Sequence, residues 1–255
     1  MTLLRDSKPS ISAILITLNE QKNIRNCLQS LLFCDEVIVV DGGSQDNTVQ
    51  IAHSLGARIV TKVSWEGFGA QKSFALSLAS SEWILSIDAD EEVSPALQNE
   101  ILMAISAGKS DGFYLSRRTQ FLGRWLRWGG WSPDYVLRVA RRSTCRFDDS
   151  PIHEKIILSG SAERLKSPLK HYSYPRISDV IQKQSRYSLA SAAMKVRESP
   201  SNYSLTGAIC RAAWKFFYLF VLRCGFLDGK TGLIAAISKS QETFWKYAAV
   251  SYLRD

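Results

Sequence analysis

The stretch WILSIDAD (residues 83–90) determines the expected fold, because a short apolar segment leads directly into two carboxylates. Two earlier segments have the same form: ISAILIT (residues 11–17) runs into Leu-Asn-Glu, and EVIVVD (residues 36–41) runs into Gly-Gly-Ser. Apolar, β-branched runs of this kind are typical of strands buried in a parallel sheet. Ligands bind such sheets outside the carboxyl ends of the strands. We therefore expect these polar strand ends to form one site.

The segments around these strands alternate between helix and strand signals, which predicts an α/β fold with a mostly parallel, Rossmann-like sheet flanked by helices. Asn19 is a candidate N-cap for the first helix, and Ser94 with Pro95 opens another. Further helices are expected at about 44–55 and 70–79, and further strands at 57–61, 111–118 and 135–140. Beyond residue 175 the pattern is helical, at about 177–197, 206–223 and 230–253. This division predicts a catalytic domain over 1–175 and a C-terminal helical extension over 176–255.

Composition indicates an ordinary globular chain with anionic partners. The 255 residues include 45% hydrophobic and 22% charged residues, and the net charge is +8. The five cysteines lack a Cys-x-x-Cys spacing, which argues against a disulfide framework or a zinc site. The first residues contain no apolar run of signal-peptide length, so we expect the chain not to be exported. Basic residues concentrate between 115 and 146 and after 205, which suits phosphate groups, nucleic acid or an acidic membrane surface.

The two carboxylates of the 83–90 stretch are candidate metal ligands. In an extended chain, residues two apart point the same way, so Asp88 and Asp90 could address one point in space. A hard divalent ion, Mg²⁺ or Mn²⁺, would relieve their repulsion and could also bind a diphosphate. The alternative is a solvated acidic turn before a helix. Asp88 and Asp90 follow a buried strand, at the same edge of the predicted sheet as two other polar strand ends. This position favours the metal site.

The order of three motifs, TLNE (17–20), VVDGGSQDNT (39–48) and DADE (88–91), resembles the inverting family-two glycosyltransferases of the GT-A fold over residues 10–175. The resemblance implies that the first two strand ends bind the nucleotide of a sugar donor. The residues it implicates in nucleotide binding are Thr17, Asn19, Glu20, Asp41 and Asp88. Asp46 would support the loop or simply cap a helix. Lys72 would face the donor diphosphate or be an exposed helix lysine.

An inverting transfer needs a carboxylate that takes the proton of the acceptor hydroxyl. Two acids are candidates for this base: Asp134, the one acid in a strongly basic stretch, and Glu154, which follows His153. We prefer Asp134 slightly, and the resemblance assigns His153 to the metal or the diphosphate. Alternatively, Asp134 pairs with a nearby arginine and His153 is a packed strand residue.

The segment from 120 to 133 is a candidate acceptor loop. Trp125, Trp128 and Trp131 recur every three residues among arginines, as on a short amphipathic helix. Indole faces stack on sugar rings, and arginine binds phosphate or carboxylate groups through forked hydrogen bonds. We expect Trp128, Trp131 and Arg138 to contact the acceptor, although at least one tryptophan of the loop should be a core residue.

The C-terminal part contains the apolar run FFYLFVL (216–222) beside basic residues. This run is too short to span a bilayer. It suits a helix lying in an anionic membrane interface, or a helical hairpin or dimer contact.

The motifs HE (153–154), LKHY (169–172), GFLDG (225–229) and WKY (245–247) resemble the lipopolysaccharide inner-core β-glucosyltransferases of Gram-negative bacteria. Ala140 departs from the bulky aromatic usual in that group. The resemblance implies transfer of glucose from UDP-glucose to a heptose of the lipid A core. It also implies a peripheral location on the cytoplasmic face of the inner membrane.

Two other functions remain open. The same fold could act on a polyprenyl phosphate or another glycan, although such enzymes usually carry longer membrane spans. A non-catalytic protein that binds nucleic acid or lipid through its arginines would show salt-sensitive binding without dependence on UDP. No RNA-binding aromatic motif or DNA-reading helix pair stands out, so we expect no nucleic-acid partner. A homodimer is compatible with each of these functions.

Overall fold

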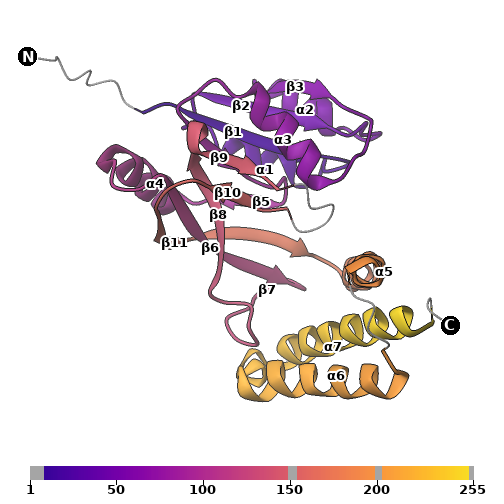
Figure 1. The fold of residues 1–255 in the computed structure, drawn as a ribbon. Helices are drawn as coiled ribbons and strands as arrows, with labels where there is room; N and C mark the ends of the chain where they lie inside the picture. Colours follow the sequence, from indigo (N-terminus) through magenta and orange to yellow (C-terminus); the bar gives the residue numbers. More distant parts are fainter. Residues whose placement is uncertain (1–8, 149–153, 199–202, 253–255) are drawn as a thin grey trace, which may run out of the picture. The chain divides into compact units, whose positions relative to one another are not determined.

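The computed structural model describes residues 9–148, 154–198 and 203–252. The chain forms two compact units. The first contains the residues up to Arg117 together with Tyr135–His171, and the second contains Arg118–Asp134 together with the residues from Tyr172 onward. Each unit has a hydrophobic core of its own, and Figure 1 shows the elements of both.

The main sheet begins with the parallel strands expected from the apolar runs. β1 (Ile11–Thr17) pairs in parallel with β2 (Glu36–Asp41) and β4 (Trp83–Ser86), and β2 pairs in parallel with β3 (Arg58–Thr61). The remaining strands of this sheet are β5 (Glu91–Val93), β6 (Gly112–Phe121), β7 (Arg124–Trp125), β8 (Asp134–Arg141) and β11 (Ala162–Tyr174). The strand order is β3-β2-β1-β4-β8-β6-β11-β5, with β7 beside β6. β8 runs antiparallel to β4, so the sheet is mixed.

Helices cover both faces of the parallel strands because the strand residues alternate in direction. On one face, Ile11, Ala13 and Leu15 pack in one core with residues of α1 (Ile24–Gln29), α2 (Thr48–Ser54) and α4 (Pro95–Ala107). On the other face, Ile14 packs with residues of α3 (Phe68–Leu78). The short strands β9 (Cys145–Phe147) and β10 (Ile156–Leu158) form a separate antiparallel pair after the 3-10 turn η1 (Arg142–Thr144).

The second unit combines the β6–β7 hairpin with helices. These are α5 (Ile177–Glu198), α6 (Leu205–Phe217), the π-helical turn η2 (Tyr218–Leu222), the 3-10 turn η3 (Gly225–Asp228) and α7 (Gly229–Tyr252). Its core contains Phe121, Leu126, Val180 and Ala235, with Trp131 packed against them. The expected helical C-terminal part is confirmed.

Three local expectations are wrong. Asn19 does not cap a helix, since α1 starts at Ile24 with Asn23 at the cap position, and Asn19 has a φ of 57°. The tryptophan segment begins as a β-hairpin and not as a helix, because Leu122 and Gly123 both have positive φ and turn the chain back into β7. Asp88 and Asp90 lie after the end of β4, in a turn. Ala140, where the sequence lacks the expected aromatic residue, is fully buried in β8.

Candidate active site

The carboxyl ends of β1 and β2 lie side by side, with Thr17 opposite Asp41. The buried Asp41 carboxylate accepts hydrogen bonds from the backbone N–H of Gly43 at 2.9 Å and of Ser44 at 2.8 Å. It also accepts from the hydroxyls of Thr17 at 3.2 Å and Ser44 at 2.5 Å. Gly43 supplies the positive φ of 96° that the turn requires. Asp41 therefore fixes the shape of the loop after β2.

Asn19 joins the first two strand ends to each other. Its backbone N–H donates to the Ser44 hydroxyl at 2.9 Å, and its side-chain oxygen accepts from the Gln45 N–H at 2.8 Å. The next residue, Glu20, donates its N–H to the Thr48 hydroxyl at 2.8 Å. The sequence-predicted nucleotide residues of these two loops thus form one connected surface.

Asp46 supports the loop before α2, but the cap residue of that helix is Asn47 and not Asp46. Its carboxylate accepts from the Thr48 N–H at 3.0 Å, from the Thr48 hydroxyl, and from the Gln21 N–H at 3.2 Å. Burial raises the pKa of Asp46, but these hydrogen bonds outweigh it and lower the pKa below its ordinary value. The side chain is therefore charged at neutral pH and holds the start of α2 against the first loop.

Asp88 lies between two cations. One carboxylate oxygen is 2.9 Å from Nζ of Lys72, and the other accepts from the Arg138 guanidinium. Burial raises the pKa of Asp88, but Arg138 and Lys72 outweigh it and hold the pKa well below its ordinary value. Because both oxygens are engaged by protein cations, the Asp88 carboxylate is fixed in place and ionised.

The buried Glu91 contacts both Arg138 and Asp88. One of its oxygens is 2.6 Å from the Arg138 guanidinium, and the other accepts the Asp88 N–H at 3.0 Å. Burial lowers the pKa of Arg138, but Asp88 and Glu91 outweigh it and raise that pKa above its ordinary value. No role was predicted for Glu91, because nothing in DADE distinguishes a buried glutamate from a solvated one.

Glu154 joins the same group through Lys72, since its carboxylate is 2.6 Å from Nζ. Lys72 itself is almost fully buried, so the interpretation of an exposed helix lysine is wrong. We call Lys72, Asp88, Glu91, Arg138 and Glu154 the ion-pair cluster. Of the two candidate bases, Glu154 belongs to this cluster. Asp134 is the first residue of β8 and belongs to the second unit. His153 lies outside the described residues.

Asp90 has a different partner from Asp88. Its oxygen is 3.4 Å from Nε2 of His171, and both side chains are mostly buried. His171 reaches this position because it lies opposite Glu91 in the β11–β5 ladder. The sequence placed His171 in a run resembling the lipopolysaccharide enzymes but gave it no role.

These residues fit a divalent metal whose shell is completed by substrate. Within the described ranges, no group of three or more His, Cys, Asp or Glu side chains is arranged as a metal site. Mg²⁺ needs no such cage, since it is usually bound by one or two carboxylates together with substrate phosphates. Asp90, with His171 beside it, supplies one such carboxylate, and the Asp88 oxygens bind Lys72 and Arg138.

The predicted acceptor residues lie in different environments. Arg138 is buried in the ion-pair cluster, so its contacts are carboxylates of the first unit and not an exposed acceptor surface. Trp131 packs on Phe121 and Tyr174 in the core of the second unit, at ring distances of 5.7 and 5.9 Å, which is the core role expected of one tryptophan. Trp128 is 44% exposed and remains a candidate for an acceptor contact.

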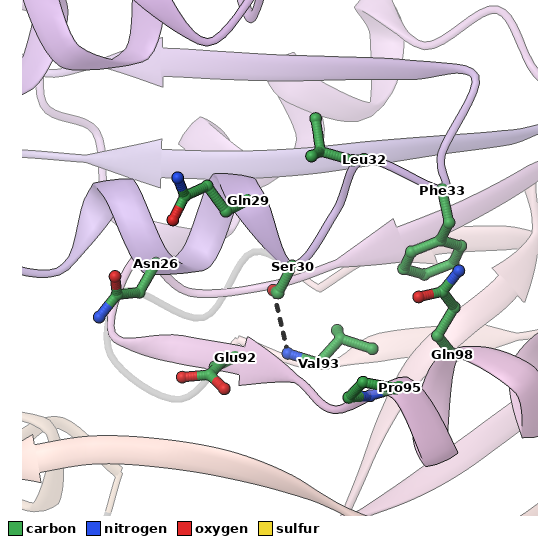
Figure 2. A pocket seen from close by; sticks show the side chains of 9 residues that line it. All are labelled: Asn26, Gln29, Ser30, Leu32, Phe33, Glu92, Val93, Pro95 and Gln98. Carbon is green, nitrogen blue, oxygen red and sulfur yellow. Dashed lines mark hydrogen bonds between the residues drawn. The ribbon is translucent and has the colours of Figure 1, made fainter.

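A separate hollow of about 630 Å³ lies beside α1, β5 and the start of α4 (Figure 2). In its wall the Ser30 hydroxyl accepts the Val93 N–H at 3.0 Å. Its lining residues are Asn26, Gln29, Ser30, Leu32, Phe33, Glu92, Val93, Pro95 and Gln98. None of them belongs to the ion-pair cluster or to the loops after β1 and β2, so this hollow is not part of the candidate site.

Comparison with known proteins agrees with this geometry. A glycosyltransferase of Rickettsia conorii is 33% identical over 89% of this chain and 84% of its own length. The lipopolysaccharide core biosynthesis glycosyltransferase LpsC of Rhizobium meliloti is 30% identical over 94% of both chains. The crystal structure of residues 1–349 of S. aureus TarS in complex with UDP-GlcNAc has a TM-score of 0.51 and 15% identity, covering 96% of this chain and 91% of that one. The GT-A fold expected from the strand-end motifs is confirmed. The sequence pattern of Glycosyl transferase family 2 matches residues 12–156, and the chain belongs to this family.

Proposed function

We propose that this glycosyltransferase inverts the anomeric carbon while moving glucose from UDP-glucose to a heptose of the lipopolysaccharide core. The acceptor class rests on the similarity to LpsC, which extends over 94% of both chains. The UDP-sugar donor is supported by the structural similarity to TarS, which was crystallised with UDP-GlcNAc. We also propose a peripheral location on the cytoplasmic face of the inner membrane, as the similarity to LpsC suggests.

The observation that carries the proposal is the Lys72 ammonium, which contacts Asp88 and Glu154 at 2.9 and 2.6 Å. A donor diphosphate entering beside Asp88 would compete with Glu154 for Lys72, because phosphate oxygens bind ammonium groups strongly. Lys72 would then stabilise the charge that develops on the departing UDP. The Glu154 carboxylate would lose its counter-ion and become a better base.

In the reaction, the acceptor hydroxyl oxygen forms a bond to the anomeric carbon while the bond from that carbon to the UDP oxygen breaks. The hydroxyl proton passes to a carboxylate. We assign this role to Glu154 because it belongs to the ion-pair cluster, and Asp134 is the second candidate. Glu154→Gln should abolish transfer while Asp134→Asn retains it, and the opposite result would assign the base to Asp134.

We further propose that the reaction depends on a divalent metal, Mg²⁺ or Mn²⁺, held by Asp90 with His171 beside it. Such an ion supplies charge neutralisation to the diphosphate leaving group. His153 stays a candidate ligand. Calorimetric titration of the protein with Mn²⁺ and UDP should show binding that Asp90→Asn and His171→Gln weaken, and unchanged binding in both variants would contradict this assignment.

The donor can be tested by measuring the melting temperature with a panel of nucleotide sugars, with and without Mn²⁺. A ligand that binds only the folded chain stabilises it by about 2.7 kcal/mol at one hundred times its dissociation constant. UDP-glucose should give the largest increase. A larger shift with another UDP-sugar would change the donor, and transfer to a polyprenyl phosphate instead of a heptose would change the acceptor.

A further inference from the structure

The second unit carries an exposed apolar stripe along α6 and η2. Positions 205, 209, 213, 217 and 221 follow one another at intervals of four residues, so each is turned by about 40° from the one before it and together they form a slowly winding stripe. We call Leu205, Ile209, Ala213, Trp214, Phe217 and Val221 the α6 apolar face. Its five large side chains are between 41% and 60% exposed. This is the opposite of the burial expected for the core helix of a hairpin.

The partner helix α7 does not cover this face. α6 packs through other positions, and its buried residues are Ala208 and Ala212, followed by Leu219 in η2. The Ser240 hydroxyl of α7 donates to the Ala212 carbonyl at 2.7 Å, which fixes the contact side. The α6 apolar face is therefore available to a further partner.

Length and composition alone would allow this segment to cross a bilayer. Residues Leu205–Leu222 form the one stretch, among the helices that the structure describes, that is long and apolar enough, with a mean hydropathy of 1.4. However, α6 is packed against α7, which carries the Lys239–Glu242 ion pair. A spanning arrangement would draw these charges into hydrocarbon, which is strongly unfavourable. A helix lying in the interface avoids this cost.

The charge of the segment selects the partner. Residues 205–252 contain six cations and two acids, a balance of 6 − 2 = +4. Both acids already have partners, because Asp228 accepts the Trp128 N–H and Glu242 pairs with Lys239. A second copy of this chain docked on the same face would bring two positive segments together, whereas anionic lipid headgroups would neutralise them.

We propose that the α6 apolar face lies in the headgroup region of an anionic bilayer, with the helix parallel to the surface. Trp214 and Phe217 would enter the boundary between headgroups and acyl chains, where aromatic side chains are favoured. The inference deepens the proposed function by naming the surface that brings the enzyme to its lipid-anchored acceptor, and it rests on that function only for the role of the membrane.

The test is co-sedimentation of the full chain with phosphatidylcholine vesicles, with and without phosphatidylglycerol. We expect binding to the anionic vesicles, and a decrease of about tenfold in Phe217→Asp, since one buried aromatic side chain contributes roughly this factor. The matched control is Met103→Asp, which adds the same charge at a 74% exposed apolar residue of α4 and should leave binding unchanged.

A second measurement does not depend on the folding of an Asp variant. Brominated lipids should quench tryptophan emission of the wild-type chain, and Trp214→Phe should remove most of this quenching. Equal binding by Phe217→Asp and wild type, absence of binding to either vesicle, or a dimer that Phe217→Asp dissociates without vesicle binding would each overturn the inference. Stabilisation by UDP-glucose, measured on the same samples, separates these failures from a failure of the proposed function.

Discussion

At the scale of single residues, Arg138 is the side chain on which the site depends most. It contacts Asp88 and the fully buried Glu91, so it joins two carboxylates of the segment that follows β4. Removing one partner of a buried ion pair leaves an uncompensated charge, which typically costs about 3–5 kcal/mol. We therefore predict that Arg138→Met lowers the free energy of unfolding by about this amount and abolishes transfer.

Urea denaturation followed by circular dichroism measures the change. Glu82→Gln is the control, because it removes the partner of Arg141 in a pair that is partly exposed on both sides and should cost less than about 1 kcal/mol. Equal effects of the two substitutions would show that the cluster is not a buried support of the turn.

Asp88 gives a prediction about pH. Its pKa in the folded chain is well below the ordinary value of about 3.9. A depressed carboxyl pKa stabilises the folded state above the unfolded pKa, and this stabilisation is lost as the pH falls toward the folded pKa. The free energy of unfolding should therefore decrease below about pH 4. Asp88→Asn should show a smaller decrease over the same range, and parallel curves for the two proteins would contradict the assignment.

At the scale of elements, the α6–α7 connection depends on close backbone packing. A Cβ at Gly232 would lie 2.0 Å from the carbonyl oxygen of Gly225. A backbone atom cannot rotate away, so overpacking should cost about 1–3 kcal/mol. We predict that Gly232→Ala lowers the melting temperature, although alanine in a helix is more favourable than glycine by about 1 kcal/mol.

The matched change is Gly207→Ala in α6. There the nearest atom is Nη1 of Arg211 at 2.8 Å, the end of a flexible side chain that can move aside. This variant should stay within about 1 kcal/mol of wild type, owing to the same helix preference. If Gly232→Ala were equally harmless, the connection would tolerate a wider turn than the structure has.

The elements also show what the sequence could predict. β1, β2 and β4 were predicted because both of their faces are buried, so each reads as an unbroken apolar run. β11 was not predicted as a strand. Its residues, AERLKSPLKHYSY, change burial irregularly and include Pro168, so neither alternation nor an apolar run marks them. The position of His171 beside Asp90 could not be derived without the register of that strand.

The ion-pair cluster was predictable only in part, for a similar reason. The three strand-end loops could be predicted from local motifs, and their proximity follows because parallel strands end at the same edge of a sheet. Arg138 comes from an antiparallel strand beside β4, and it was expected at the acceptor because arginine there is equally suited to a phosphate. Which anion an arginine contacts depends on tertiary register, and spacing along the chain does not contain that information.

At the scale of the whole molecule, chemistry and membrane attachment belong to different units. The ion-pair cluster lies in the first unit and the α6 apolar face in the second. A substitution on that face should therefore change how the acceptor is reached and leave the chemical step intact. We predict that Phe217→Asp transfers glucose to a soluble, delipidated core saccharide at the wild-type rate, since Phe217 and the ion-pair cluster belong to different units.

With the same saccharide on its lipid in anionic vesicles, the rate of Phe217→Asp at subsaturating acceptor should fall about tenfold, in proportion to the lost binding. The loss should appear in KM for the acceptor, because surface attachment raises the local acceptor concentration without altering the reacting groups. Added salt should lower the rate of the wild type on the lipid-linked acceptor until it approaches that of the variant, since salt screens the positive charge of residues 205–252, +4 in all, from the headgroups. A fall in kcat with the soluble acceptor would instead show that Phe217 affects the chemical step. Catalysis and membrane binding would then not be separate functions of the two units.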